Sequence, residues 1–247
     1  MEYMLDVFLF VSTFIAYFVK GITGFGNTLV MGSLFSFVVP NRLTTPVDLL
    51  FSLPTNAYMA WRERKSLSLK TALPLAGLLL VGILPGVFLL KTGNDWVLKA
   101  ILGAVIMGLA LEMLLRRPMQ GEQKKASVVS LALIGLLSGV LVGMYGIGAL
   151  LVTYINRITQ NRSQFRANTC FIFLTENIFR VVLYAATGLL TKEVLLLALT
   201  LAPAVALGMF VGIKVDKRLN EKAVRYTIIG LLLLSGATLL VKSLFFH

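Results

Sequence analysis

The sequence is poor in the residues on which disulfide, zinc and redox chemistry depend. Its 247 residues include one cysteine, Cys170, and one histidine, His247, at the end of the chain. A disulfide framework needs pairs of cysteines, and a structural zinc site needs about four Cys or His ligands. These absences exclude both kinds of site, and we expect the protein to use no cofactor.

Charged residues are also scarce. They make up 14% of the chain, whereas hydrophobic residues make up 57%, and the mean hydropathy is +0.87. In soluble domains charged residues account for about a quarter of the chain. Apolar stretches of about 20 residues, enough to cross about 30 Å of hydrocarbon, recur along the whole sequence. We therefore predict an all-α, polytopic transmembrane protein whose solvent is the lipid bilayer.

The net charge of +12 has a simple origin in such a protein. In a soluble protein it would suggest nucleic-acid binding, but short cytoplasmic loops of membrane proteins are rich in Lys and Arg. We expect no nucleic-acid partner. Glu2 and Asp6 stand where a secretory signal would carry basic residues, and no small-residue cleavage site follows, so we read the start as mature sequence.

Two of the apolar segments are too long for a single span. The segments cover residues 5–39, 44–61, 71–90, 96–115, 127–156, 167–186, 193–213 and 223–241. Glycines interrupt the first segment between Gly21 and Asn27 and the fifth between Gly143 and Gly148. We predict a broken helix or a re-entrant hairpin at each interruption.

The glycines also indicate an internal duplication. Gly21, Gly24 and Gly26 align with Gly143, Gly146 and Gly148 at a shift of 122. Further pairs follow at shifts of 126 and 127: Gly82 with Gly208, Gly86 with Gly212, and Gly103 with Gly230. Repetition at a fixed period indicates repeated structural units. We predict a first transmembrane repeat at residues 1–120 and a second at 123–247, within one integral membrane unit.

Loop charges predict how the two repeats are oriented. If all eight segments were simple spans, 10 Lys and Arg would lie inside and 11 outside. If each broken segment enters and leaves on one side, each repeat makes three full crossings, and the split becomes 16 inside and 5 outside. Basic loops are retained in the cytoplasm. We therefore predict inverted repeats with both termini extracytoplasmic.

The two interruptions are our candidate binding site. A break at membrane depth frees backbone groups that lipid cannot satisfy, and the N-terminus of the half-helix that follows is suited to anions. Paired broken helices in inverted halves point to a transporter's midplane site. The predicted site residues are Gly24, Phe25, Gly26, Asn27, Thr28, Gly146, Ile147 and Gly148. The alternative is that these glycines only allow close helix packing.

Three further residues are candidates for lining this site. Asn56 and Asn177 correspond at a shift of 121, so they are either symmetric lining residues or interhelical hydrogen-bond partners. Lys20 directly precedes the first interruption. It supplies a positive charge to the site, or it extends toward the membrane interface.

Ionisable residues also occur inside apolar segments, where they are costly and mark pairs or pathways. Glu176 and Arg180 are four residues apart, so they share a helix face and can pair. They are either a structural ion pair or part of proton coupling or anion binding. Asp48 is the second carboxylate that we consider for coupling.

With these motifs in view, the chain resembles the sulfite exporter TauE/SafE family of membrane permeases over nearly its whole length. The resemblance rests on residues 21–26, 139–148 and 166–169, which read GITGFG, GVLVGMYGIG and RANT. It implies a secondary transporter of sulfur-containing anions, such as sulfite or organosulfonates, in a bacterial inner membrane. The chain departs from the family pattern at Asn27 and Ala149, where a further glycine is usual, and no proline follows within residues 152–155.

We therefore predict a permease, not an enzyme, that moves a small anion by alternating access. One rival is an intramembrane enzyme acting on a lipid or isoprenoid head group, which would need clustered carboxylates, an activated nucleophile or metal ligands. The other rival is a non-transporting membrane subunit. The sequence names neither the substrate nor the direction or coupling of transport. A homodimer, common among small permeases, is an open alternative to a monomer.

Overall fold

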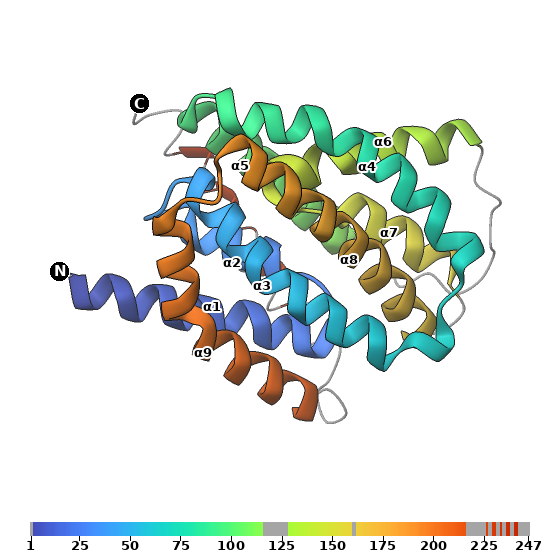
Figure 1. The fold of residues 1–247 in the computed structure, drawn as a ribbon, viewed down its shortest axis with the longest axis horizontal. Coiled ribbons are helices and arrows are strands. Elements are labelled where there is room, and N and C mark those ends of the chain that lie inside the picture. The colour runs from blue at the N-terminus through green and yellow to red at the C-terminus, as the bar shows by residue number, and fades with distance from the viewer. Residues whose placement is uncertain are drawn as a thin grey trace. The chain divides into compact units, whose positions relative to one another are not determined.

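The computed structural model describes residues 2–115, 128–159 and 162–215, and then residues 226, 229, 230, 233, 236, 237, 240 and 241. This part of the chain is helical and contains no strand (Figure 1). Its elements are α1 (Glu2–Thr23), α2 (Asn27–Phe35), α3 (Asn41–Arg62), the short 3-10 helix η1 (Arg64–Ser66), α4 (Leu69–Thr92), α5 (Asp95–Leu115), α6 (Val128–Tyr145), α7 (Ala149–Ile158), α8 (Arg162–Thr187) and α9 (Lys192–Val215). The predicted repeat boundary and most of the predicted segment 223–241 lie outside the described residues.

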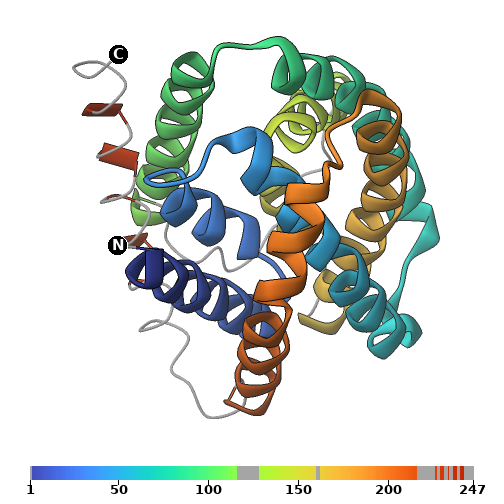
Figure 2. The same cartoon turned by 60° about the vertical axis from the view of Figure 1, so that its left-hand side comes forward.

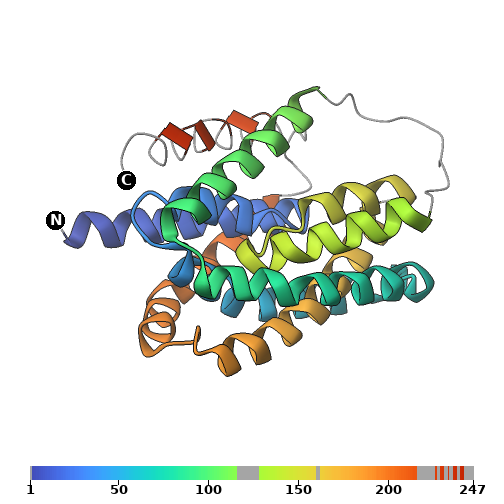
Figure 3. The same cartoon turned by 90° about the horizontal axis from the view of Figure 1, so that it is seen from above.

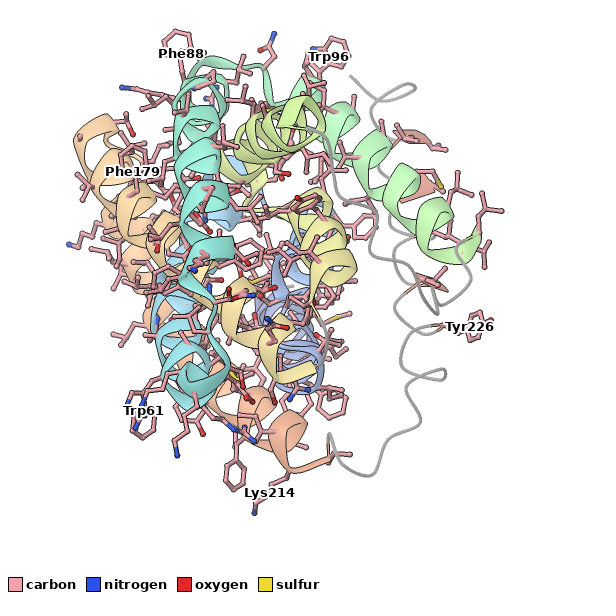
Figure 4. All side chains as sticks on the ribbon, turned by 90° about the vertical axis from the view of Figure 1, so that its right-hand side faces the viewer. Trp61, Phe88, Trp96, Phe179, Lys214 and Tyr226 are labelled. Atoms are coloured by element: carbon pink, nitrogen blue, oxygen red, sulfur yellow. The ribbon has the colours of Figure 1, made fainter. Side chains whose placement is uncertain are left out.

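Four of the described helices are long and apolar enough to cross a membrane: residues Met4–Thr23 of α1, all of α4, Ser163–Thr187 of α8, and all of α9. Large apolar side chains face outward, including Phe88 of α4 and Trp61 of α3, which are about two-thirds exposed and project from the helices (Figure 4). Such exposure is unfavourable in water and expected in lipid. The predicted all-α, polytopic membrane fold is confirmed.

The two glycine-rich interruptions are breaks between separate helices. Helix α1 ends at Thr23 and α2 begins at Asn27, whereas α6 ends at Tyr145 and α7 begins at Ala149. Each gap is three residues long and contains two glycines. The long apolar segments therefore each consist of a long helix followed by a helix of 9 or 10 residues.

The chain forms two compact units. Unit 1 contains residues 1–44, 93–120 and 199–247, and unit 2 contains residues 45–92 and 121–198. Each unit thus combines segments from both predicted repeats. Unit 1 holds the first break and unit 2 the second.

In unit 2, α4 and α6 lie side by side with their backbones in close contact (Figure 3). A Cβ atom added at Gly82 would lie 2.3 Å from the carbonyl oxygen of Leu136, and one at Gly86 would lie 2.4 Å from that of Val140. No side chain fits at either position. Small residues of this kind let membrane helices approach closely and gain van der Waals contact.

In unit 1, α1 and α9 make the same contact (Figure 2). A Cβ atom at Gly208 would lie 2.4 Å from the carbonyl oxygen of Phe14, and one at Gly212 would lie 2.3 Å from that of Phe18. Phe14 and Phe18 come 122 residues before Leu136 and Val140, which accept the same contacts in unit 2. Gly208 and Gly212 come 126 residues after Gly82 and Gly86. The two helix pairs therefore pack in the same register.

This close packing predicts a position-specific loss of stability. Gly82→Ala forces the α4 and α6 backbones apart, and overpacking of this kind costs typically 1–3 kcal/mol. Gly77→Ala on the same helix meets nothing within 4 Å and should be neutral or slightly stabilising. Thermal unfolding of both variants in detergent measures the difference. Equal midpoints would show that the α4–α6 contact does not require glycine.

Candidate functional site

The break in unit 2 leaves the N-terminus of α7 without a cap. Gly146 adopts a left-handed conformation with φ of 73°, and its N–H donates to the carbonyl oxygen of Val142 at 2.8 Å, which ends α6. Gly148 is the N-cap residue of α7, and no side chain caps the helix there. The first helical bond runs from Val152 N–H to the Gly148 oxygen at 2.9 Å. The N–H groups of the first turn therefore have no partner within the helix. They present the positive end of the helix dipole at the break.

The break in unit 1 repeats these backbone hydrogen bonds. Gly24 is left-handed with φ of 86°, and its N–H donates to the carbonyl oxygen of Lys20 at 2.7 Å. Val30 N–H donates to the oxygen of Gly26 at 3.2 Å, and α2 also begins without a side-chain cap. Each of these bonds has its equivalent in unit 2 at the shift of 122. The two breaks share these bonds but differ at the residue before the half-helix, because Gly26 is left-handed with φ of 88° whereas Gly148 has φ of −97°.

The side chains around the break in unit 1 are polar. Lys20 is fully buried, and its Nζ lies 5.8 Å from the centre of the Tyr17 ring. The Asn27 amide donates to the Tyr17 hydroxyl and to Thr28 Oγ1, both at 3.3 Å. Phe25 is held through its backbone by the Thr23 hydroxyl. Unit 1 thus gathers a cation, a phenol and an amide beside its break.

Helix α8 covers the break in unit 2. Its Phe173 ring lies against Gly148, so that a Cβ atom added there would be 2.4 Å from the ring. About two and three turns further on, Arg180 Nη1 donates to the Val142 oxygen at 2.5 Å, and the Tyr184 hydroxyl donates to the Gly143 oxygen at 3.0 Å. Residues 173, 177, 180 and 184 share one helix face. This α8 face therefore runs from the start of α7 to the last turn of α6.

Three carbonyl groups in the last turn of α6 accept hydrogen bonds from side chains. Besides Arg180 and Tyr184, Thr45 Oγ1 donates to the Met144 oxygen at 3.4 Å. Arg180 also faces Glu176, with Nε 3.6 Å from Oε2, and both side chains are buried. A cation at a helix C-terminus offsets the negative end of the dipole. Arg180 therefore stabilises the C-terminal end of α6 at the break.

Asn177 lies between these two groups of contacts. Its side chain is 1% exposed, and neither Oδ1 nor Nδ2 has a hydrogen-bond partner among the residues that the structure describes. Phe173 and Arg180, its neighbours on the α8 face, contact Gly148 and Val142, so Asn177 is level with the break itself. An unsatisfied buried amide costs about 1–3 kcal/mol, which a bound ligand would offset.

Asn56 of α3 is a second buried amide in unit 2. It is 2% exposed, and its Oδ1 lacks a partner within the described part of the chain. Helices α3 and α8 run in opposite directions (Figure 1). Asp48, near the start of α3, interacts electrostatically with Arg180, and Ser68, beyond its end, donates its N–H to Asn168 at 2.9 Å. Asn56 therefore lies at about the same height along α8 as Asn177.

The predicted site residues thus fall into two groups. Unit 1 brings together Lys20, Gly24, Phe25, Gly26, Asn27 and Thr28. Unit 2 holds Asp48, Asn56, Gly146, Ile147, Gly148, Glu176, Asn177 and Arg180. Sequence reasoning missed Tyr17, Thr45, Phe173 and Tyr184. The signal for Phe173 and Tyr184 was their spacing on the face of α8 that carries Asn177 and Arg180.

A polytopic helical protein with two broken helices, each opening an uncapped N-terminus beside buried polar side chains, has the architecture of a secondary permease. The comparison with known families agrees. The model of the Sulfite exporter TauE/SafE family matches residues 9–239, and the chain belongs to this family of membrane transport proteins. Neither the curated proteins nor the solved structures contain a significant match.

Proposed function

We propose that this protein is a secondary permease that carries a small sulfur oxyanion, sulfite or an organosulfonate, across the bacterial inner membrane by alternating access. Membership of the family supports transport of this class of anion. The observation that carries the proposal is the open N-terminus of α7 beside Asn177, a buried amide whose two polar atoms have no partner in the described residues.

These groups suit an oxyanion. The N–H groups in the first turn of α7 would donate to its oxygens, and the helix dipole favours negative charge at this end. The Nδ2 atom of Asn177 would donate a further hydrogen bond. Asn56, at about the same height along α8, would also line the site. Hydrogen bonds to a charged group are worth about 1.5–3 kcal/mol each. A small number of them therefore compensates part of the cost of bringing an anion out of water.

Unit 1 would supply a second group of anion-binding residues. The N-terminus of α2, with Asn27, Thr28 and Lys20 beside it, offers donors and a positive charge to an anion. We propose that the two halves are inverted repeats and that the protein alternates between states open to each side of the membrane, with both termini extracytoplasmic. A proton-coupled cycle would use Asp48 or Glu176, two buried carboxylates of unit 2.

Uptake into proteoliposomes tests this function. Purified protein is reconstituted, and labelled sulfite, sulfoacetate, taurine and sulfate are offered with and without an imposed proton gradient; protein-free liposomes are the control. We expect saturable uptake of at least one sulfur oxyanion. A rate that rises with the gradient would support proton coupling. No uptake of any of the four under either condition would contradict the proposal and favour a non-transporting subunit.

A further inference from the structure

We propose that Phe173 controls access to Asn177 from the end of unit 2 where η1 lies. The inference rests on the proposed function, because it concerns the route by which an anion reaches the break. It gives an apolar side chain control of access, whereas the polar candidates would bind the anion.

The first observation is the contact between Phe173 and Gly148. A Cβ atom at Gly148 would lie 2.4 Å from Cε1 and 2.5 Å from Cζ of the ring, so the aromatic edge rests on the backbone of the break. Gly148 is buried, whereas Phe173 itself is only half-buried. The ring therefore has free surface on one side while it closes against α7 on the other.

The second observation is the order of residues along α8. At the η1 end, Asn168 accepts the N–H of Ser68 at 2.9 Å, which ties the start of α8 to the start of α4. Phe173 comes next on the way to the break, and Asn177 lies one turn beyond it. After Asn177, Arg180 and Tyr184 are bonded to the end of α6. A ligand approaching Asn177 along α8 from the η1 end must therefore pass the Phe173 ring.

The third observation concerns the matching position in the first repeat. At the shift of 121 that relates Asn177 to Asn56, Phe173 corresponds to Ser52, whereas at the shift of 122 that relates the two breaks it corresponds to Phe51. The residue four positions before the paired asparagine is therefore aromatic in the second repeat and a serine in the first. Hydrophobic constrictions gate permeation by excluding water. Because Phe173 lies on the η1 side of Asn177, we expect it to control access from that side.

Thiol labelling tests the proposal without requiring transport. Cys170 is the single cysteine of the chain and is buried, so a Cys170→Ser background is free of thiols. Asn177→Cys is introduced there, and its reaction with a membrane-impermeant methanethiosulfonate is followed from each side of the membrane. We expect slow labelling with Phe173 present and labelling about tenfold faster or more with Phe173→Ala, from one side only.

Two variants complete the test. Phe173→Leu keeps most of the volume and should leave labelling slow. Phe179→Ala, two residues after Asn177 on α8 and so on the opposite helix face, should also leave it slow. Equal labelling rates with Phe173, alanine and leucine, in protein that still elutes as a single folded species, would overturn the proposal. Phe173-dependent labelling in a protein that transports none of the four anions would instead contradict the proposed function and leave the access role standing.

Discussion

Arg180→Leu is expected to destabilise the protein by about 3–5 kcal/mol, the cost of removing one partner from a buried ion pair. Glu176 would lose the guanidinium 3.6 Å away, and the Val142 oxygen would lose its side-chain donor. Both groups are in the interior of unit 2, where water does not replace the lost bonds. Thermal unfolding in detergent, with the yield of monodisperse protein, measures the effect.

Two variants show whether the loss has this origin. Tyr184→Phe removes only the bond to the Gly143 oxygen and should cost about 1 kcal/mol. Adding Glu176→Gln to Arg180→Leu removes the uncompensated charge and should recover part of the loss. If Arg180→Leu instead retained full stability and lost only uptake, Arg180 would bind the anion rather than stabilise the end of α6.

Asn177→Leu is expected to lower the uptake rate at low substrate by about 10- to 100-fold while leaving stability unchanged or higher. Leucine has the same number of side-chain heavy atoms as asparagine and the same branching at Cγ. The amide makes no hydrogen bond to the described residues, so the fold loses no hydrogen bond. The anion loses a hydrogen bond worth about 1.5–3 kcal/mol. Uptake of the substrate identified in the liposome assay, normalised to folded protein, measures this effect.

Asn168→Leu is the matched control, on the same helix and equally buried. Its Oδ1 accepts the Ser68 N–H, so this variant should lose stability. Uptake per folded molecule should stay near that of the wild type. Equal losses of uptake in the two variants would mean that Asn177 acts through the fold and not on the anion.

Much of the backbone of the site was predictable from glycines alone. A helix that ends in a left-handed residue favours glycine strongly, so Gly24 and Gly146 mark the two breaks in the sequence itself. The positions where no Cβ fits, such as Gly82 and Gly208, repeat at a constant shift because the two helix pairs share a register. The spacing of the glycines is therefore enough to predict the two breaks.

The role of Arg180 could not be predicted in this way. Its spacing from Glu176 indicates a pair, and the sequence left open whether the pair serves transport or the fold. The hydrogen bond to Val142 joins residues 38 positions apart and has a backbone acceptor, which leaves no trace in sequence. The contact of Phe173 with Gly148 is equally hidden, because one more phenylalanine among 16 carries no signal. Both depend on tertiary packing.

The most direct test of the site is equilibrium binding of labelled sulfite to the purified protein in detergent, with wild type and Asn177→Leu measured side by side. We expect saturable binding to the wild type and binding at least about tenfold weaker to the variant, because the variant lacks one hydrogen bond to a charged ligand. Binding of equal strength in the two proteins would contradict it and place the anion away from the break in unit 2.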